Sequence, residues 1–114
     1  MNDCTHQVIF TIVEKGFAEE AMAAARKAGA GGGTIINAKG TFKDTEKFYG
    51  VELHPEKEML MIVVPTQKRN EIMAAIAGKC GLATNGKGVS FSLPVSETFG
   101  FFEQKNNSNE DLPL

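Results

Sequence analysis

A repeated segment constrains the fold of this chain more than any other feature of its sequence. The five residues from Glu20 read EAMAA and the five from Glu71 read EIMAA, so four of five positions are identical at an offset of 51 residues. At the same offset, the apolar pair at 12–13 lies over the apolar pair at 63–64. Each copy therefore predicts the same unit, a buried strand that leads into a helix.

In both copies a glycine-rich turn and a second strand follow the helix. Runs of apolar or β-branched residues bounded by polar ones predict the strands. They cover residues 8–13, 34–38, 59–64 and 89–93. Alanine-rich stretches with one apolar stripe predict helices at 17–28 and 66–79. Thr66, directly after Pro65, is predicted to be the N-cap of the second helix, and Pro94 predicts that the last strand lies at a sheet edge or ends there.

Two such units predict an α+β fold of the ferredoxin-like type. This fold is a split βαβ in the order βαββαβ, in which one antiparallel sheet carries both helices on one face. The domain is expected to span residues 6–102. Alternate side chains of the strands would point to the open face, where Val8, Phe10, Ile12 and Phe91 need a cover. This need predicts a homotrimer.

Two segments do not fit the repeat. Residues 41–58 connect the two units through a polar, highly charged stretch that is too long for a simple connection, and loops of this kind are usually functional. We expect the part from Thr41 to His54 to be mobile without a ligand and ordered by one. Residues 103–114 have no apolar periodicity and are expected to form a disordered tail.

Charge and cysteine content exclude several classes of protein. The 114 residues carry 12 Lys and Arg against 14 Asp and Glu, a net charge of −2, whereas nucleic-acid-binding domains usually gather an excess of basic residues. Cys4 and Cys80 do not stand in a C-x-x-C or zinc spacing. The longest apolar run, at 59–64, is too short to span a bilayer. We therefore expect a cytoplasmic protein that binds no nucleic acid.

A glycine-lysine segment near the end of the second unit is the first candidate for ligand binding. Gly81, Gly86 and Lys87 fit the first seven positions of a P-loop, but Gly88 stands where Ser or Thr should hold magnesium. The segment also runs from a helix into a strand, the reverse of a P-loop. What remains is a weaker anion site, in which the backbone from Asn85 to Gly88 and one ammonium face an anion. The alternative is a flexible hairpin or helix exit.

The glycine-rich segment of the first unit leaves two interpretations open. Residues 29–33 follow a helix and lead into a strand at Thr34, which reverses the order of a Rossmann dinucleotide loop. The segment is either a helix C-cap with close backbone packing or a place where a ligand ring approaches bare backbone.

Residue patterns for catalysis or metal binding are weak. His54 stands beside carboxylates, but the other histidine, His6, is far away in the sequence. No Ser-His-Asp or Cys-His arrangement has support from the sequence. The arginines, Arg26 and Arg69, fall within the predicted helices, whereas an acylphosphatase of this fold needs an arginine just after the first strand. We expect no catalytic residue and no metal site.

The order of these motifs resembles the PII family of nitrogen-regulatory signalling proteins from about residue 6 to residue 95. The resemblance is carried by AGAGGGT at 28–34, KG at 39–40, PEKE at 55–58, IVVP at 62–65 and NGKG at 85–88. It implies a non-catalytic homotrimer that binds an adenine nucleotide, ATP or ADP, as a regulatory ligand in clefts between subunits, with no obligatory cofactor. Residues 41–58 would then correspond to the T-loop, which contacts a target such as a membrane transporter or a metabolic enzyme.

The resemblance also implies roles for individual residues. Residues near the adenine would be Gly32, Gly33 and Thr34, with the base paired to the backbone of Val63. The phosphates would lie against Gly86, Lys87 and Gly88 through charge-assisted contacts. Gly40 would lie at the root of the loop, and Lys57 would lie near the carboxylate of the effector, 2-oxoglutarate in this family.

The chain departs from the family in two places. No glutamine before Glu46 matches the residue that binds magnesium and 2-oxoglutarate in the family. After the last strand, where the family supplies arginines to the phosphates, this chain has Glu97, Phe99, Phe101 and Phe102. An alternative therefore stays open, a trimeric ferredoxin-like interaction protein that has lost nucleotide binding.

Overall fold

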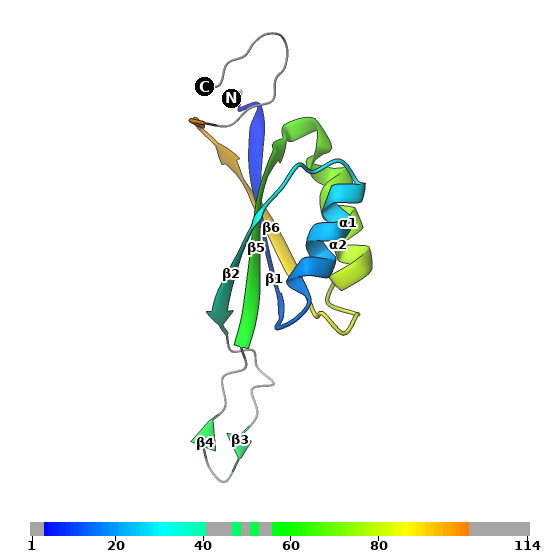
Figure 1. The fold of residues 1–114 in the computed structure, drawn as a ribbon, viewed down its shortest axis with the longest axis vertical. Coiled ribbons are helices and arrows are strands. Elements are labelled where there is room, and N and C mark those ends of the chain that lie inside the picture. Colours follow the sequence, from blue (N-terminus) through cyan, green and yellow to red (C-terminus); the bar gives the residue numbers. More distant parts are fainter. Residues whose placement is uncertain (1–3, 41–46, 49–50, 53–55, 101–114) are drawn as a thin grey trace.

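The computed structural model describes residues 4–40, 47–48, 51–52 and 56–100. Its elements follow in the order β1 (His6–Glu14), α1 (Ala18–Lys27), β2 (Thr34–Lys39), β3 (Lys47–Phe48), β4 (Val51–Glu52), β5 (Glu56–Pro65), a 3-10 turn η1 (Thr66–Lys68), α2 (Arg69–Cys80) and β6 (Val89–Val95). Four strands form one sheet in the order β2-β5-β1-β6, and both helices lie against one face of it (Figure 1). The predicted ferredoxin-like α+β class is confirmed.

Strand β1 is one of the two central strands of the sheet. It pairs antiparallel with β5, from His6 opposite Pro65 to Glu14 opposite Lys57, and antiparallel with β6 on its other side. Buried and half-buried residues alternate along its whole length. This alternation follows from the pleat, because successive side chains of a strand point to opposite faces. One face of β1 therefore points to the helices and the other does not.

The core lies between the helices and one face of the sheet. The sheet contributes fully or almost fully buried residues from its two central strands, namely Ile9, Val13, Leu60, Ile62 and Val64. The helices contribute Ala18, Ala21, Ala25, Ile72, Ile76 and Cys80, all 0% exposed. Burial of one such isoleucine stabilises the fold by about 1.5–3 kcal/mol, and the alanines bring α1 close to the sheet.

The opposite face of the sheet is apolar but only partly covered in the single chain. Phe10 lies opposite Phe91 in the β1–β6 register, and their rings stack with centroids 5.3 Å apart. Val8 and Ile12 share this face by alternation. Phe91 is 44% exposed, and its neighbour Leu93 is 50% exposed. The prediction that Val8, Phe10, Ile12 and Phe91 share the open face is thus confirmed, and the homotrimer stays a prediction.

The start of the second helix differs from the prediction. Thr66 is not the N-cap of α2, because a 3-10 turn over Thr66–Lys68 comes first and Lys68 occupies the N-cap position. The Thr66 hydroxyl instead donates to the Cys4 carbonyl at 3.1 Å, and its N–H donates to the Thr5 carbonyl at 2.9 Å. Thr66 therefore fastens the segment before β1 to the end of β5.

The connection between the two units is shorter than the sequence indicated. Strand β5 begins at Glu56 and not at Met59, so the last three residues of the predicted 41–58 segment belong to the sheet. Within the segment, the short strands β3 and β4 pair with each other (Figure 1). The predicted mobility concerns residues that lie mostly outside the described part.

The last strand agrees with the sequence. Strand β6 is an edge strand, and Pro94 lies opposite Gln7 near its end. The predicted tail, 103–114, lies outside the described residues, as do Phe101 and Phe102. In the described part of the chain, no helix has the length and hydrophobicity needed to cross a lipid bilayer.

Candidate functional site

The residues expected to hold a nucleotide lie at opposite edges of the sheet. Thr34 opens β2, the edge strand next to β5, and lies opposite Met61. Residues 86–88 lead into β6, the other edge strand. One chain therefore does not bring the two groups together. They can form one site only where the β2 edge of one copy adjoins the β6 edge of another.

The first glycine-rich segment begins as a helix C-cap. Gly29 has a left-handed backbone (φ 116°) directly after the C-cap residue of α1. Its N–H donates to the Arg26 carbonyl at 3.0 Å, and the N–H of Ala30 donates to the Ala25 carbonyl at 2.9 Å. These two bonds are those of a Schellman motif. Glycine at 29 is therefore explained by the helix end without a ligand.

The glycines that follow Gly29 divide into an open and a packed part. A methyl group built on Gly31 or Gly32 meets nothing within 4 Å, whereas one on Gly33 would lie 3.0 Å from the Met61 carbonyl oxygen. The absence of a side chain at Gly33 thus lets the start of β2 lie close to β5. The three glycines and Thr34 are all exposed, so each of them can meet a ligand, although packing already explains the glycine at position 33.

The second glycine-rich segment already uses the backbone donors that an anion would need. The N–H of Gly86 donates to the Thr84 hydroxyl at 3.2 Å. The N–H of Lys87 donates to the Thr84 carbonyl at 3.1 Å, and that of Gly88 donates to the Cys80 carbonyl at 2.6 Å. The described loop therefore offers an anion the exposed Lys87 side chain rather than a nest of free amides.

The glycines on either side of Lys87 are required by packing. A methyl group on Gly86 would lie 3.1 Å from Cβ of Cys80, and one on Gly88 would overlap the Cys80 carbonyl oxygen. The left-handed backbone of the loop falls on Lys87 itself, at φ 49°. A substitution of Lys87 by another residue with a Cβ changes the charge but not this backbone requirement.

Gly40 and Lys57 do lie together, at the root of the 41–55 segment. A methyl group on Gly40 would be 3.3 Å from Cγ of Lys57. Lys57 is 4% exposed, and its ammonium donates to Oε2 of Glu14 at 2.9 Å. Sequence reasoning missed Glu14. The antiparallel register of the two central strands places Glu14 directly opposite Lys57, and the predicted strands, 8–13 and 59–64, ended before both residues.

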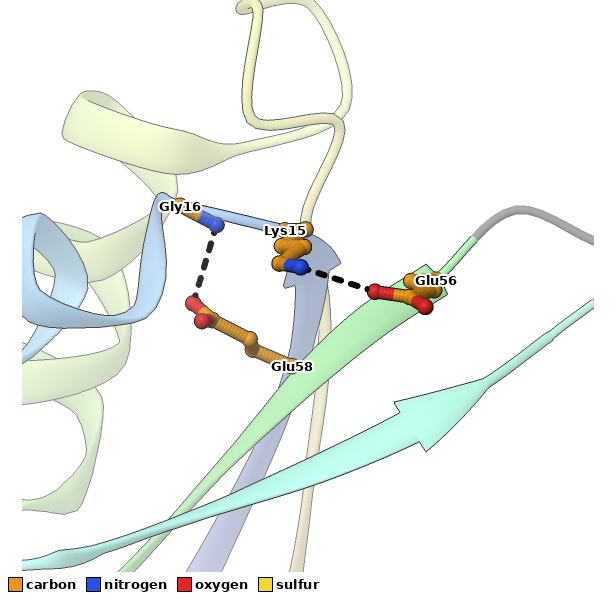
Figure 2. A network of polar contacts seen from close by, with 4 residues as sticks. All are labelled: Lys15, Gly16, Glu56 and Glu58. Atoms are coloured by element: carbon orange, nitrogen blue, oxygen red, sulfur yellow. Dashed lines mark hydrogen bonds and ion pairs between the residues drawn. The ribbon is translucent and has the colours of Figure 1, made fainter.

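A second polar cluster lies at the same end of the sheet, on the side of the helices (Figure 2). Lys15 donates to Oε1 of Glu56 at 2.9 Å, and the hydrogen bond and charge of Lys15 lower the pKa of Glu56 below its usual value. Oε1 of Glu58 accepts hydrogen bonds from the N–H groups of Gly16, at 3.1 Å, and Ala18, at 3.0 Å. Glu58 of β5 therefore caps the N-terminus of α1.

An open recess of about 420 Å³ lies beside this second cluster. It is lined by Lys15, Asn37, Ala38, Lys39 and Glu56. Two lysines and one carboxylate give it mixed charge at the point where β2 ends and β5 begins. The recess therefore marks the root of the 41–55 segment on the helix side.

Cys80 is a packing residue. It is 0% exposed, its thiol lies 3.7 Å from the Phe17 carbonyl, and burial raises the pKa of the thiol. A buried thiol with a raised pKa is a poor nucleophile. Among the described residues, no group of three or more His, Cys, Asp or Glu side chains could hold a metal ion.

The fold and these edges define a ferredoxin-like domain whose candidate ligand groups lie at opposite sheet edges of one chain, and solved structures are similar to it over most of its length. The crystal structure of Arabidopsis thaliana PII bound to citrate matches 85% of this chain and 81% of its own, with a TM-score of 0.66 and 23% sequence identity. A scan against protein-family models and a search of curated proteins both give no match. The likeness shows that this chain has a PII-like fold.

Proposed function

We propose that this chain is a non-catalytic, PII-like signalling regulator that binds an adenine nucleotide or a related small effector between subunits. The observation that carries the proposal is the placement of the candidate residues. Thr34 lies at one edge of the sheet and Lys87 lies beside the other, so both groups serve one ligand only in an assembly of copies. The PII-like fold supports the same assembly.

The open face of the sheet supplies the reason for the copies to associate. Phe10 and Ile12 of β1, with Phe91 and Leu93 of β6, form an apolar surface on the face of the sheet that points away from α1 and α2 (Figure 1). Large exposed apolar surfaces are uncommon on monomers. A cyclic homotrimer would bury this face and bring unlike edges together.

In the cleft between two subunits, the β2 edge of one copy and the loop before β6 of the other would bind different parts of the nucleotide. The exposed backbone of Gly32, Gly33 and Thr34 would lie against the adenine of ATP or ADP, with Val63 near the base. Lys87 of a neighbouring subunit would neutralise the phosphates through a charge-assisted hydrogen bond. Gly86 and Gly88 would keep the loop in the shape that holds Lys87 at the cleft.

The 41–55 segment would carry the signal to a target. It leaves the sheet at Gly40 and returns at Glu56, beside Lys57. A ligand at this root would change how the segment is held, and the segment would then bind or release a cytoplasmic face of a membrane transporter or a metabolic enzyme. Control of nitrogen metabolism is the proposed setting.

The experiment that tests the proposal combines the oligomeric state with ligand titration. Light scattering is expected to show a trimer, and calorimetric titration with ATP and ADP is expected to show binding at one site for each subunit. A stable monomer across the micromolar range would remove the intersubunit site and contradict the proposal. A trimer that binds neither nucleotide would contradict the nucleotide part of it.

The second candidate is a trimeric ferredoxin-like interaction protein that has lost nucleotide binding. Two observations favour it. The amides of residues 86–88 are satisfied inside the loop, and Phe99, which follows β6, is 98% exposed. The same titration separates the two candidates, because a trimer without nucleotide binding is the result that this second candidate predicts.

A further inference from the structure

Glu14 and Lys57 form an ion pair on the face of the sheet that is otherwise lined mainly by apolar side chains. Along the β1–β5 register this face begins with His6 opposite Pro65 at one end of the sheet and continues with three apolar pairs. These are Val8 with Val63, Phe10 with Met61 and Ile12 with Met59, and the next is Glu14 with Lys57. An apolar pair at the last position would continue the surface without the desolvation that a buried ammonium costs. The charged pair therefore calls for a role other than packing.

The pair also occupies a particular place. The Lys57 stem lies over Gly40 at the root of the 41–55 segment. The N–H of Glu14 donates to the Gly86 carbonyl at 2.9 Å, next to Lys87. Glu14 thus joins the loop that is proposed to hold phosphates with the lysine that is proposed to meet an effector. Its side chain is 30% exposed, whereas that of Lys57 is 4% exposed.

We propose that Glu14 is a specificity-determining residue that occupies Lys57 in place of a ligand carboxylate, so that the effector site at the loop root excludes carboxylic acids. The inference rests on the proposed function only in taking the loop root as an effector site. It narrows the effector to a molecule without a free carboxylate. 2-Oxoglutarate and citrate then become molecules that this chain rejects.

The physical reason is charge balance at short range. An ammonium has three donors, but its charge is already compensated by the carboxylate 2.9 Å away. A second carboxylate at Lys57 would also lie within a few ångströms of Glu14, and like charges at that distance repel strongly in a partly buried site. Neutral or cationic groups meet no such penalty.

The test measures the binding of citrate and of 2-oxoglutarate by calorimetry, with and without ATP and magnesium. Wild type is expected to bind neither acid. Glu14→Gln, which removes the charge but keeps the size, is expected to bind them at least about tenfold more tightly than wild type. Glu14→Gln combined with Lys57→Met is expected to lose this gain. The dimethyl ester of 2-oxoglutarate, which has no charge, should not distinguish the variants.

Glu56→Gln is the matched control. It removes one negative charge from the same end of the sheet, but from the exposed cluster on the helix side. It should leave the binding of both acids unchanged. A gain in Glu56→Gln equal to that in Glu14→Gln would overturn the inference, because net charge rather than position would then decide.

Two further results would overturn it. One is a folded Glu14→Gln, shown by circular dichroism, that binds no better than wild type. The other is binding of either acid to wild type that is lost in Lys57→Met, a comparison that stands even where Glu14→Gln does not fold. Failure of the proposed function has a different signature, since wild type would then bind no adenine nucleotide whatever the carboxylate titrations give.

Discussion

Two lysine–carboxylate pairs lie at the same end of the sheet, and they differ in their surroundings rather than in their geometry. Lys57 donates to Glu14 and Lys15 donates to Glu56, both at 2.9 Å. The first pair has side chains that are 4% and 30% exposed, the second has side chains that are 67% and 59% exposed. Alternation along β5 separates them, because successive residues point to opposite faces.

The difference shows that the distance between two charged groups does not by itself determine how much their ion pair contributes to stability or to ligand choice. An exposed pair gains little, since water and salt screen it and two long side chains lose freedom. In a buried pair each partner depends on the other, because a charge without its partner is costly in a medium of low dielectric. The buried pair can therefore set structure and ligand choice, and the exposed pair can be lost with little effect.

Glu14→Gln is expected to have the largest effect on folding. It removes the carboxylate that faces a buried ammonium, so the free energy of unfolding should fall by about 2–3 kcal/mol. Lys57→Met should lower the free energy of unfolding by less, about 1 kcal/mol, because Glu14 can turn toward water and the methionine side chain fills the same space. Urea unfolding of the two single variants and the double variant measures this asymmetry.

The double variant is the control for the asymmetry. The double variant Glu14→Gln with Lys57→Met is expected to be at least as stable as Glu14→Gln alone. If it is less stable, the stability lost in Glu14→Gln comes from packing and not from an ammonium without its carboxylate. The contrast between the buried and the exposed ion pair would then fail. Equal decreases in the free energy of unfolding of Glu14→Gln and Lys57→Met would show that neither side chain is effectively buried.

Much of the fold could be predicted from the sequence because the repeat and the alternation report directly on elements and faces. The strands and helices lie within a few residues of their predicted places, and Phe10 and Phe91 lie on the expected face. The start of α2 could not be predicted, because the Thr66 side chain binds a residue before β1, and such a long-range bond has no local signal. The same holds for Glu58, which caps a helix that begins forty residues earlier.

The candidate site could be predicted only as a set of residues. Gly32, Gly33 and Thr34 are exposed as a ligand site requires, but the glycine at 29 is explained by the helix end and the glycine at 33 by packing. A glycine is informative about backbone conformation and close approach, and it does not say whether a ligand or the protein itself makes the approach. The carboxylate at Glu14 was missed for a related reason, because its role depends on the partner strand.

Lys87→Ala tests another lysine near this end of the sheet, which is exposed like Lys15 but is proposed to meet phosphate. Binding of ATP should weaken by about 1.5–3 kcal/mol, the magnitude of a charged hydrogen bond. The thermal midpoint without ligand should stay near that of wild type, because the alanine keeps the same left-handed backbone demand. The nucleotide-induced shift of the midpoint should fall accordingly.

Gly88→Val is not a useful companion to Lys87→Ala, since its side chain would overlap the Cys80 carbonyl and disturb folding. Lys79→Ala is the better control, because Lys79 is an exposed lysine in the last turn of α2. It should leave ATP binding unchanged. Equal affinity in wild type and Lys87→Ala would show that the phosphates lie elsewhere.

Glu58→Ala is expected to have a smaller effect, on folding alone. The two hydrogen bonds that Glu58 accepts from Gly16 and Ala18 satisfy orphan donors at the start of α1, and loss of such a cap costs about 1 kcal/mol. Hydrogen exchange should increase first in the amides of Gly16 and Ala18. Unchanged exchange at both positions would mean that water replaces the carboxylate without cost.

Glu56→Gln is expected to have the smallest effect on stability, and the direction in which this effect changes with pH follows from the pKa of Glu56. The hydrogen bond from Lys15 lowers the pKa of Glu56 in the folded chain, so any contribution of this pair to stability is present above the unfolded pKa of the carboxyl and is lost as the pH falls through its folded pKa. Wild type and Glu56→Gln should therefore have thermal midpoints that coincide in acid and differ at most slightly at neutral pH, with the difference removed by salt at about 1 M. A difference that persists in salt, or that grows as the pH falls, would show that the pair is shielded from water and would remove the contrast with Glu14 and Lys57.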